Sequence, residues 1–139
     1  MYRRSFLTLT AATAAGLTMP SLLRAAPIDY HPGLIEERLD AGETLFLDFK
    51  ASWCTTCAAQ ERILTKLKAE NPTYEKVITF VNIDWDTYGK AGFTQRMRIP
   101  RRSTLVVLKG NDEIGRLVAD TREEKIRELL DAAVTAASA

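Results

Sequence analysis

An apolar segment that leads directly into a pair of cysteines constrains the fold of this chain most. Residues 43–50 are rich in Leu and Phe and carry one interior acid, Asp48. This pattern is typical of a strand buried on both faces of a parallel or mixed sheet. Cys54 and Cys57, the only cysteines, follow at once, and an amphipathic pattern over 58–70 then predicts a helix. The cysteines are therefore expected at a helix start.

A thiol at a helix N-terminus meets the positive end of the helix dipole and unpaired backbone N–H groups. Both stabilise the thiolate, and the pKa of such cysteines is typically about 3.5–7.5. A mixed disulfide formed at Cys54 can be resolved by Cys57, so the pair can exchange two electrons with another protein. The spacing therefore predicts a redox site.

Two other interpretations of the cysteine pair are a zinc site and a structural disulfide. A structural zinc needs four ligands, and the sequence offers a single histidine, His31, and no second cysteine pair. A disulfide that closes so short a loop removes little entropy from the unfolded chain. We therefore expect no metal and no cofactor other than the redox-active disulfide Cys54–Cys57.

Length and composition predict one globular domain. The chain has 139 residues, of which 46% are apolar and 27% charged, which is enough to bury one core. Its 19 basic and 18 acidic residues are unevenly placed, because three arginines and no acid lie in residues 1–26. The remainder carries a slight excess of acid, which does not favour nucleic acid or an anionic membrane surface as a partner.

Residues 1–26 are expected to be a targeting segment, and 27–139 the folded domain. The segment has a basic start, a mildly apolar middle and small residues at its end. Tyr2-Arg3-Arg4-Ser5-Phe6-Leu7 resembles the twin-arginine signal that exports folded proteins. Retention as an N-terminal anchor is the alternative, although the threonines in the apolar run make a poor spanning helix. We expect export to the periplasm or another part of a bacterial cell envelope.

Asp48 is the unusual residue of the apolar segment. A carboxylate in a strand buried on both faces has a raised pKa and can exchange protons near neutral pH. Its position six residues before Cys54 places it near the cysteine pair. The alternative is a solvated carboxylate at the strand edge.

Four sequence motifs resemble the thioredoxin family and occur in that family's order. They are Asp48-Phe49-x-Ala51-x-Trp53-Cys54-x-x-Cys57, Val81-Asn82-Ile83-Asp84, Ile99-Pro100, and Leu105 to Gly110 followed by Glu113 and Gly115. The resemblance implies an α/β protein with the thioredoxin fold, a central mixed β-sheet flanked by helices on both faces in a single domain.

Residue patterns agree with that order. After a short helix in 34–42, they predict strands over 43–50, 77–85, 103–109 and 113–119 and helices over 58–70 and 87–97. Thr121 to Glu124 forms a capping-box pattern, which predicts the start of a final helix there.

The resemblance also implies residue roles. Cys54 attacks or is attacked, Cys57 resolves, Asp48 helps to take the proton from Cys57, and Trp53 shields the site. Ile99 and a cis Pro100 are expected to bind an extended substrate segment and to keep metal from the thiols. We further expect the hydroxyls of Thr55 and Thr56 to donate to the thiolate.

The sequence departs from the family pattern at several positions. Thr55 and Thr56 separate the cysteines instead of Gly-Pro, Phe80 stands at the position of a lysine, and Ala119 at that of a glycine. Arg101-Arg102-Ser103 appears as an insertion after Pro100. Arg101 and Arg102 either form a solvated loop or contact an acidic partner through charge-assisted hydrogen bonds.

Three function classes follow. The first is an exported, monomeric thiol-disulfide oxidoreductase, acting on protein thiols and disulfides as a reductase rather than an oxidase. By resemblance to similar exported proteins, a membrane thiol-electron transporter is its expected electron donor. The second is a redox-independent thioredoxin-fold binding or chaperone-like module, and the third is a metal carrier.

Overall fold

The computed structural model describes Gly16 and residues 26–139. The expected targeting segment, 1–26, thus lies outside the described residues except for Gly16 and Ala26. Within the part of the chain that is described, no helix is both long enough and apolar enough to cross a membrane.

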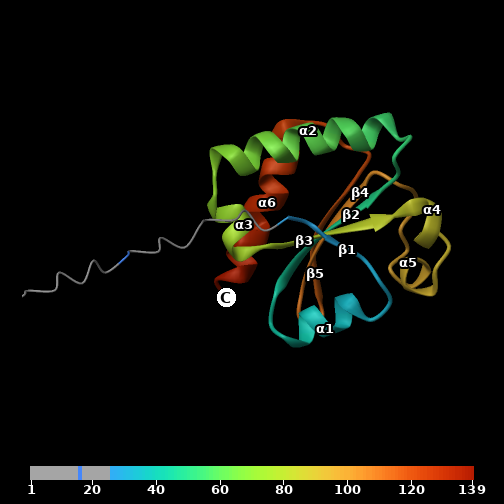
Figure 1. Ribbon diagram of the computed structural model, residues 1–139, viewed down its shortest axis with the longest axis horizontal. Helices are drawn as coiled ribbons and strands as arrows, with labels where there is room; N and C mark the ends of the chain where they lie inside the picture. Colours follow the sequence, from blue (N-terminus) through green and yellow to red (C-terminus); the bar gives the residue numbers. More distant parts are fainter. Residues whose placement is uncertain (1–15, 17–25) are drawn as a thin grey trace, which may run out of the picture.

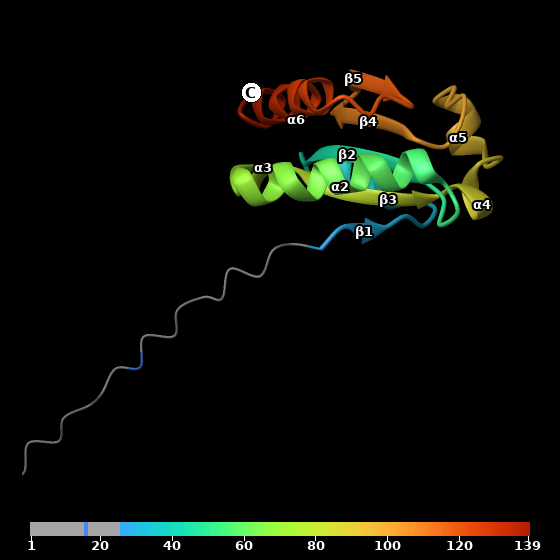
Figure 2. The same cartoon turned by 90° about the horizontal axis from the view of Figure 1, so that it is seen from above.

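Five strands form one mixed sheet. They are β1 (Ile28–Asp29), β2 (Thr44–Lys50), β3 (Thr79–Asp84), β4 (Thr104–Lys109) and β5 (Asp112–Val118). Their order across the sheet is β1-β3-β2-β4-β5, which Figure 2 shows from one edge to the other. β3 pairs in parallel with β1 and β2, whereas β4 pairs antiparallel with β2 and β5. The expected mixed sheet is therefore confirmed, with β2 at its centre.

Helices cover both faces of the sheet. They are α1 (Leu34–Asp40), α2 (Thr55–Glu70), α3 (Thr73–Val77), α4 (Trp85–Tyr88), α5 (Gly92–Arg96) and α6 (Glu123–Ala137). One core cluster joins the sheet to α2, α3 and α6, and a second joins it to α1, α4 and α5. Figure 1 shows α2 above the strands and α1 below them, with α4 and α5 beside the right-hand ends of the strands.

Successive residues of β2 contribute to the two cores in turn. Phe46 belongs to the core under α2 and α6, whereas Leu45, Leu47 and Phe49 belong to the core on the other side. This alternation follows from the pleat of a strand. Asp48 shares its face with Phe46, and hence lies on the side of the sheet that α2 covers.

The segment after β3 differs from the expected single helix over 87–97. Two short helices, α4 and α5, form instead. Gly89 follows the last residue of α4, and Gly92 is the first residue of α5. The Asp84 carboxylate accepts a hydrogen bond from the Thr87 N–H and so caps α4. β1 and α3 were not expected, because a two-residue strand and a five-residue helix carry almost no periodic signal.

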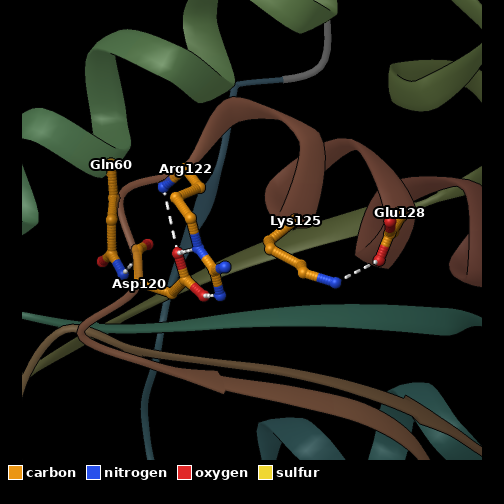
Figure 3. A network of polar contacts seen from close by, with 5 residues as sticks. All are labelled: Gln60, Asp120, Arg122, Lys125 and Glu128. Atoms are coloured by element: carbon orange, nitrogen blue, oxygen red, sulfur yellow. Dashed lines mark hydrogen bonds and ion pairs between the residues drawn. The ribbon is translucent and has the colours of Figure 1, made fainter.

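The predicted capping box at the start of α6 is wrong. Arg122 occupies the N-cap position and makes no side-chain cap hydrogen bond. Asp120 lies just before it, and its carboxylate accepts hydrogen bonds from the Arg122 N–H at 3.0 Å and from the Arg122 guanidinium (Figure 3). These bonds hold the pKa of Asp120 low, at about 2. The ion pair between Asp120 and Arg122, rather than a cap from Thr121, thus fixes the chain where it enters α6.

Candidate active site

Cys54 and Cys57 form a disulfide at the N-terminus of α2. Cys54 is the N-cap residue, and its sulfur accepts a hydrogen bond from the Cys57 N–H at 3.1 Å. Ala51 and the half-buried Trp85 pack against the pair. Only 4% of Cys54 and 2% of Cys57 is exposed. The expected helix start is confirmed, but Cys54 is more covered than its role as the attacking thiol led us to expect.

Ser103, not Pro100, faces the disulfide. The Ser103 Oγ lies 3.1 Å from the sulfur of Cys54 and 3.1 Å from that of Cys57. Pro100 is exposed, and the described residues contain no cis peptide bond. The expected cis-proline is therefore wrong. Ser103 directly precedes β4, so residues 100–102 form the loop before it rather than an insertion after the site.

The backbone of Ser103 is held on three sides. Its N–H donates to the Phe49 carbonyl at 2.7 Å, and its carbonyl accepts from the Ala119 N–H at 2.8 Å and from the Gln60 Nε2 at 3.0 Å. Ser103 and Ala119 both adopt left-handed backbone conformations, with φ of 64° and 53°. Such conformations are uncommon for residues other than Gly and are maintained by surrounding contacts.

Gln60 links this loop to α2. Its side chain is fully buried, and Nε2 also donates to the Asp120 carbonyl at 3.2 Å. Figure 3 shows Gln60 reaching from α2 toward Asp120 at the start of the α6 segment. The helix that carries the cysteines is thus bonded to both chain segments that approach them.

Trp53 directly precedes Cys54, and 56% of this residue is exposed, so its role in shielding the site stays a prediction. Its indole Nε1 donates to both carboxylate oxygens of Asp86, at 3.0 and 3.1 Å. The guanidinium of Arg102 lies 4.3 Å from the centre of the Trp53 ring. Hydrogen bonding and a cation–π contact therefore hold the ring from two sides.

Of the residues expected to bind substrate, Arg102 contacts the Trp53 ring. Ile99 is buried in the core beside Phe49, and its N–H donates to the Thr94 carbonyl at 3.2 Å, so that N–H is not free to pair with a substrate. The half-buried Arg101 donates from Nε to the Arg102 carbonyl. Substrate binding by Ile99, Pro100, Arg101 and Arg102 stays a prediction.

Asp48 is buried, as expected, with 6% exposed. Its Oδ1 has no hydrogen-bond partner among the described residues. Burial raises the pKa of Asp48 to about 6, an effect that Lys50 and Lys68 oppose and Glu61 reinforces. The carboxyl lines a pocket of about 340 Å³ between β2, β3 and α2.

Positive charge near Asp48 comes from positions other than that of Phe80. Lys50 and Lys68 line the same pocket, and the Lys68 Nζ lies 3.8 Å from the centre of the Phe80 ring. Burial lowers the pKa of Lys68. Phe80 stands where the family has a lysine, but the fold brings one lysine toward Asp48 from α2 and another from the end of β2.

The hydroxyls of Thr55 and Thr56 do not contact the sulfurs. In residues 26–139, the side-chain hydroxyl within hydrogen-bonding distance of either sulfur is that of Ser103. Thr55 is exposed and Thr56 half-buried on the first turn of α2. The expected donors were thus misassigned. Among the described residues, no group of three or more His, Cys, Asp or Glu is placed to hold a metal ion.

Comparison with known proteins gives the family. The sequence profile of the thioredoxin family matches residues 34–132, a range that includes β2, the disulfide, Ser103 and most of α6. The chain belongs to the thioredoxin family. The thioredoxin fold and the paired cysteines expected for a disulfide oxidoreductase of this family are thereby confirmed.

Individual thioredoxins resemble the chain at modest identity. Thioredoxin H5 of Oryza sativa subsp. japonica is 29% identical over 65% of this chain and 62% of its own length, and Thioredoxin H2-1 of the same plant is 27% identical over 56% and 52%. The chain thus spans less than two thirds of these relatives. The crystal structure of Trxlp from Edwardsiella tarda EIB202 superposes with a TM-score of 0.65 and 25% identity, covering 76% of this chain and 98% of that one.

Proposed function

We propose that this thioredoxin-family protein is an exported thiol-disulfide oxidoreductase of the bacterial cell envelope, which reduces disulfides in other proteins. It acts as a monomer through Cys54 and Cys57, and a membrane thiol transporter returns it to the dithiol form. The observation that carries the proposal is the disulfide at the N-terminus of α2, where the Cys57 N–H already donates to the Cys54 sulfur.

The reduction proceeds in two exchanges. The Cys54 thiolate attacks one sulfur of a substrate disulfide, a mixed disulfide forms, and the second substrate sulfur leaves with the electron pair and takes a proton from solvent. Cys57 then loses its proton and attacks the Cys54 sulfur, so the remaining substrate sulfur leaves as a thiolate. The product is the Cys54–Cys57 disulfide, and two electrons have passed to the substrate.

Asp48 is the proposed acceptor of the Cys57 proton. Burial raises the pKa of this carboxyl to about 6, so it is mostly ionised at pH 7 yet basic enough to take a proton. It makes no direct hydrogen bond to sulfur among the described residues, and the cysteines do not line its pocket, so the transfer requires a bridging water.

Two measurements test this function. The reduced wild-type protein should reduce the interchain disulfides of insulin, and Cys54→Ser should abolish that activity. A glutathione titration should give a reduction potential nearer to about −270 mV than to about −120 mV. A reduction potential near about −120 mV would instead identify the protein as an oxidant.

Export is tested separately. Residues 1–26 fused to a folded reporter should carry it to the periplasm, because the pattern at Tyr2 to Leu7 resembles a twin-arginine signal. Replacement of Arg3 and Arg4 by lysine keeps the charge but removes the pattern, and should leave the reporter in the cytoplasm. Export of both forms would contradict this route.

The low exposure of the cysteines favours a second candidate, a redox-independent binding or chaperone-like module. With 4% of Cys54 exposed and with Ala51 and Trp85 packed against the cysteine pair, a partner protein reaches the sulfur only by displacing covering groups. If Cys54→Ser retains the full phenotype of the wild-type gene, this candidate replaces the first.

A further inference from the structure

The residue that touches both reacting sulfurs is Ser103, whose Oγ lies 3.1 Å from each of them. We infer that the Ser103 hydroxyl is a catalytic group of the exchange, which donates a hydrogen bond to whichever cysteine sulfur carries the negative charge. This inference rests on the proposed function for its place in the reaction. It concerns a residue that the sequence led us to regard as part of an inserted loop.

The hydroxyl has no competing partner. In the described residues, its hydrogen-bond contacts are the sulfurs of Cys54 and Cys57 alone. A disulfide sulfur is a weak acceptor, whereas a thiolate is a charged acceptor and forms a stronger hydrogen bond. Because Ser103 is fully buried, the bond to a thiolate acts in a medium of low dielectric, which strengthens it.

The hydroxyl is also held in position before reaction. Ser103 has a φ of 64°, and its N–H and carbonyl are bonded to Phe49, Ala119 and Gln60. These bonds join it to β2, to the end of β5 and to the cysteine-bearing α2. A donor fixed in this way needs no reorganisation when charge appears on sulfur.

Equal distances to the two sulfurs suit both exchanges. In the reduced protein the charge is on Cys54, and in the mixed disulfide it moves to Cys57. Rotation about the Cβ–Oγ bond of Ser103 turns the O–H from one sulfur to the other while Oγ stays in place. The serine keeps its proton throughout, so the electron balance of the two exchanges is unchanged.

Other charges near the site stay the same when the hydroxyl is removed. The Arg102 guanidinium and the Asp86 carboxylate both contact the Trp53 side chain. The others are the Asp48 carboxylate on β2 and the ion pair of Asp120 and Arg122 before α6. The N–H of Cys57 also remains on the Cys54 sulfur. A difference in Cys54 pKa between wild type and a Ser103 variant therefore reports the hydroxyl.

The test compares Ser103→Ala and Ser103→Gly with wild type. Alanine removes Oγ and keeps Cβ, and glycine removes Oγ and tolerates the left-handed backbone, so it serves if the alanine variant does not fold. Thr94→Val is the control, because Thr94 is buried and its hydroxyl bonds to the Tyr88 carbonyl, away from sulfur. The pKa of Cys54 is read from the pH dependence of iodoacetamide alkylation of the reduced proteins.

Removal of the hydroxyl should raise the Cys54 pKa by about one unit, which is tenfold less thiolate well below the pKa. Equilibrium with glutathione at pH 7 should shift up to tenfold toward the protein disulfide, about 30 mV more negative. Thr94→Val should leave both values unchanged. An unchanged Cys54 pKa in Ser103→Gly overturns the inference even if wild type reduces insulin. A shifted Cys54 pKa supports the inference even if the wild-type protein does not reduce insulin. In that case only the proposed function fails.

Discussion

The side-chain amide of Gln60 donates a hydrogen bond of 3.0 Å to the backbone carbonyl of Ser103. Gln60 stands on the helix that begins at the cysteines, and Ser103 stands on the loop that faces them. A buried polar side chain thus fixes the distance between the two halves of the site.

Gln60→Leu should lower the free energy of unfolding by about 1–2 kcal/mol, because it removes both hydrogen bonds of the amide and leaves the Asp120 carbonyl without that donor. Urea unfolding measures the change. Gln95→Leu is the matched control, since exposed Gln95 donates to the Lys90 carbonyl; its loss should stay below about 0.5 kcal/mol. Equal losses would show that Gln60 has no special structural role.

Asp48→Asn should stabilise the protein at neutral pH. Burial raises the folded-state pKa of Asp48 to about 6 from 3.8, so the folded form binds this proton more tightly than the unfolded chain. That contribution is complete below pH 4 and is lost as the pH rises through about 6. At pH 7 the substitution should therefore add about 3 kcal/mol to the free energy of unfolding, and at pH 4 close to nothing.

Urea unfolding at the two pH values checks this difference. Asp40→Asn, at an exposed position, is the control. It should change the free energy of unfolding only slightly, and by the same amount at both pH values. A gain of equal size at pH 4 and pH 7 for Asp48→Asn would contradict a cost that comes from ionisation.

The same substitution should slow the second exchange. Without the carboxylate, Cys57 loses the proposed acceptor of its proton, so resolution of a mixed disulfide at Cys54 should fall about 100-fold at pH 7. Stopped-flow release of a chromogenic thiol from a preformed mixed disulfide measures this step. A rate equal to that of wild type would remove Asp48 from the mechanism.

Replacement of Arg101 and Arg102 by serine tests the contact with an acidic partner. Exchange with an acidic disulfide-containing protein should slow several-fold at low salt, and the dependence of its rate on ionic strength should become flatter. The double variant Arg62→Ser/Arg127→Ser removes the same charge elsewhere. If the salt dependence of the loop variant matches wild type, the arginines form a solvated loop only.

Ala119→Gly should stabilise the chain slightly. Ala119 has a φ of 53°, which costs a residue with a Cβ about 1–2 kcal/mol relative to glycine. The greater freedom of glycine in the unfolded chain offsets part of this, so a net gain of about 0.5 kcal/mol is expected. Ala132→Gly, inside α6, should instead cost about 1 kcal/mol. A loss at both positions would contradict strain at Ala119.

Local patterns were sufficient to predict β2, the cysteines at the start of α2, and the buried Asp48, because each depends on neighbours within a few residues. Ser103 could not be identified in this way. Its place is set by the antiparallel pairing of β4 with β2 and by its bond to Phe49, and Pro100 offered a stronger local signal. The contact between Trp53 and Asp86 likewise joins residues 33 positions apart.

Gln60 did leave a signal in the sequence. It follows Cys57 by three residues and precedes Leu64 by four, so it shares the inward face of α2 with both. A glutamine on a buried helical face needs hydrogen-bond partners, but its partners, Ser103 and Asp120, are fixed only by the tertiary fold.

Trapping of the mixed disulfide tests the central claim most directly. Reduced Cys57→Ser, mixed with a protein disulfide, should accumulate a covalent adduct through Cys54 that dithiothreitol releases, because the resolving thiol is absent. Reduced Cys54→Ser should form far less adduct, and mass spectrometry identifies the joined sulfurs. No adduct with Cys57→Ser, or equal adduct with both variants, would contradict attack by Cys54 and resolution by Cys57.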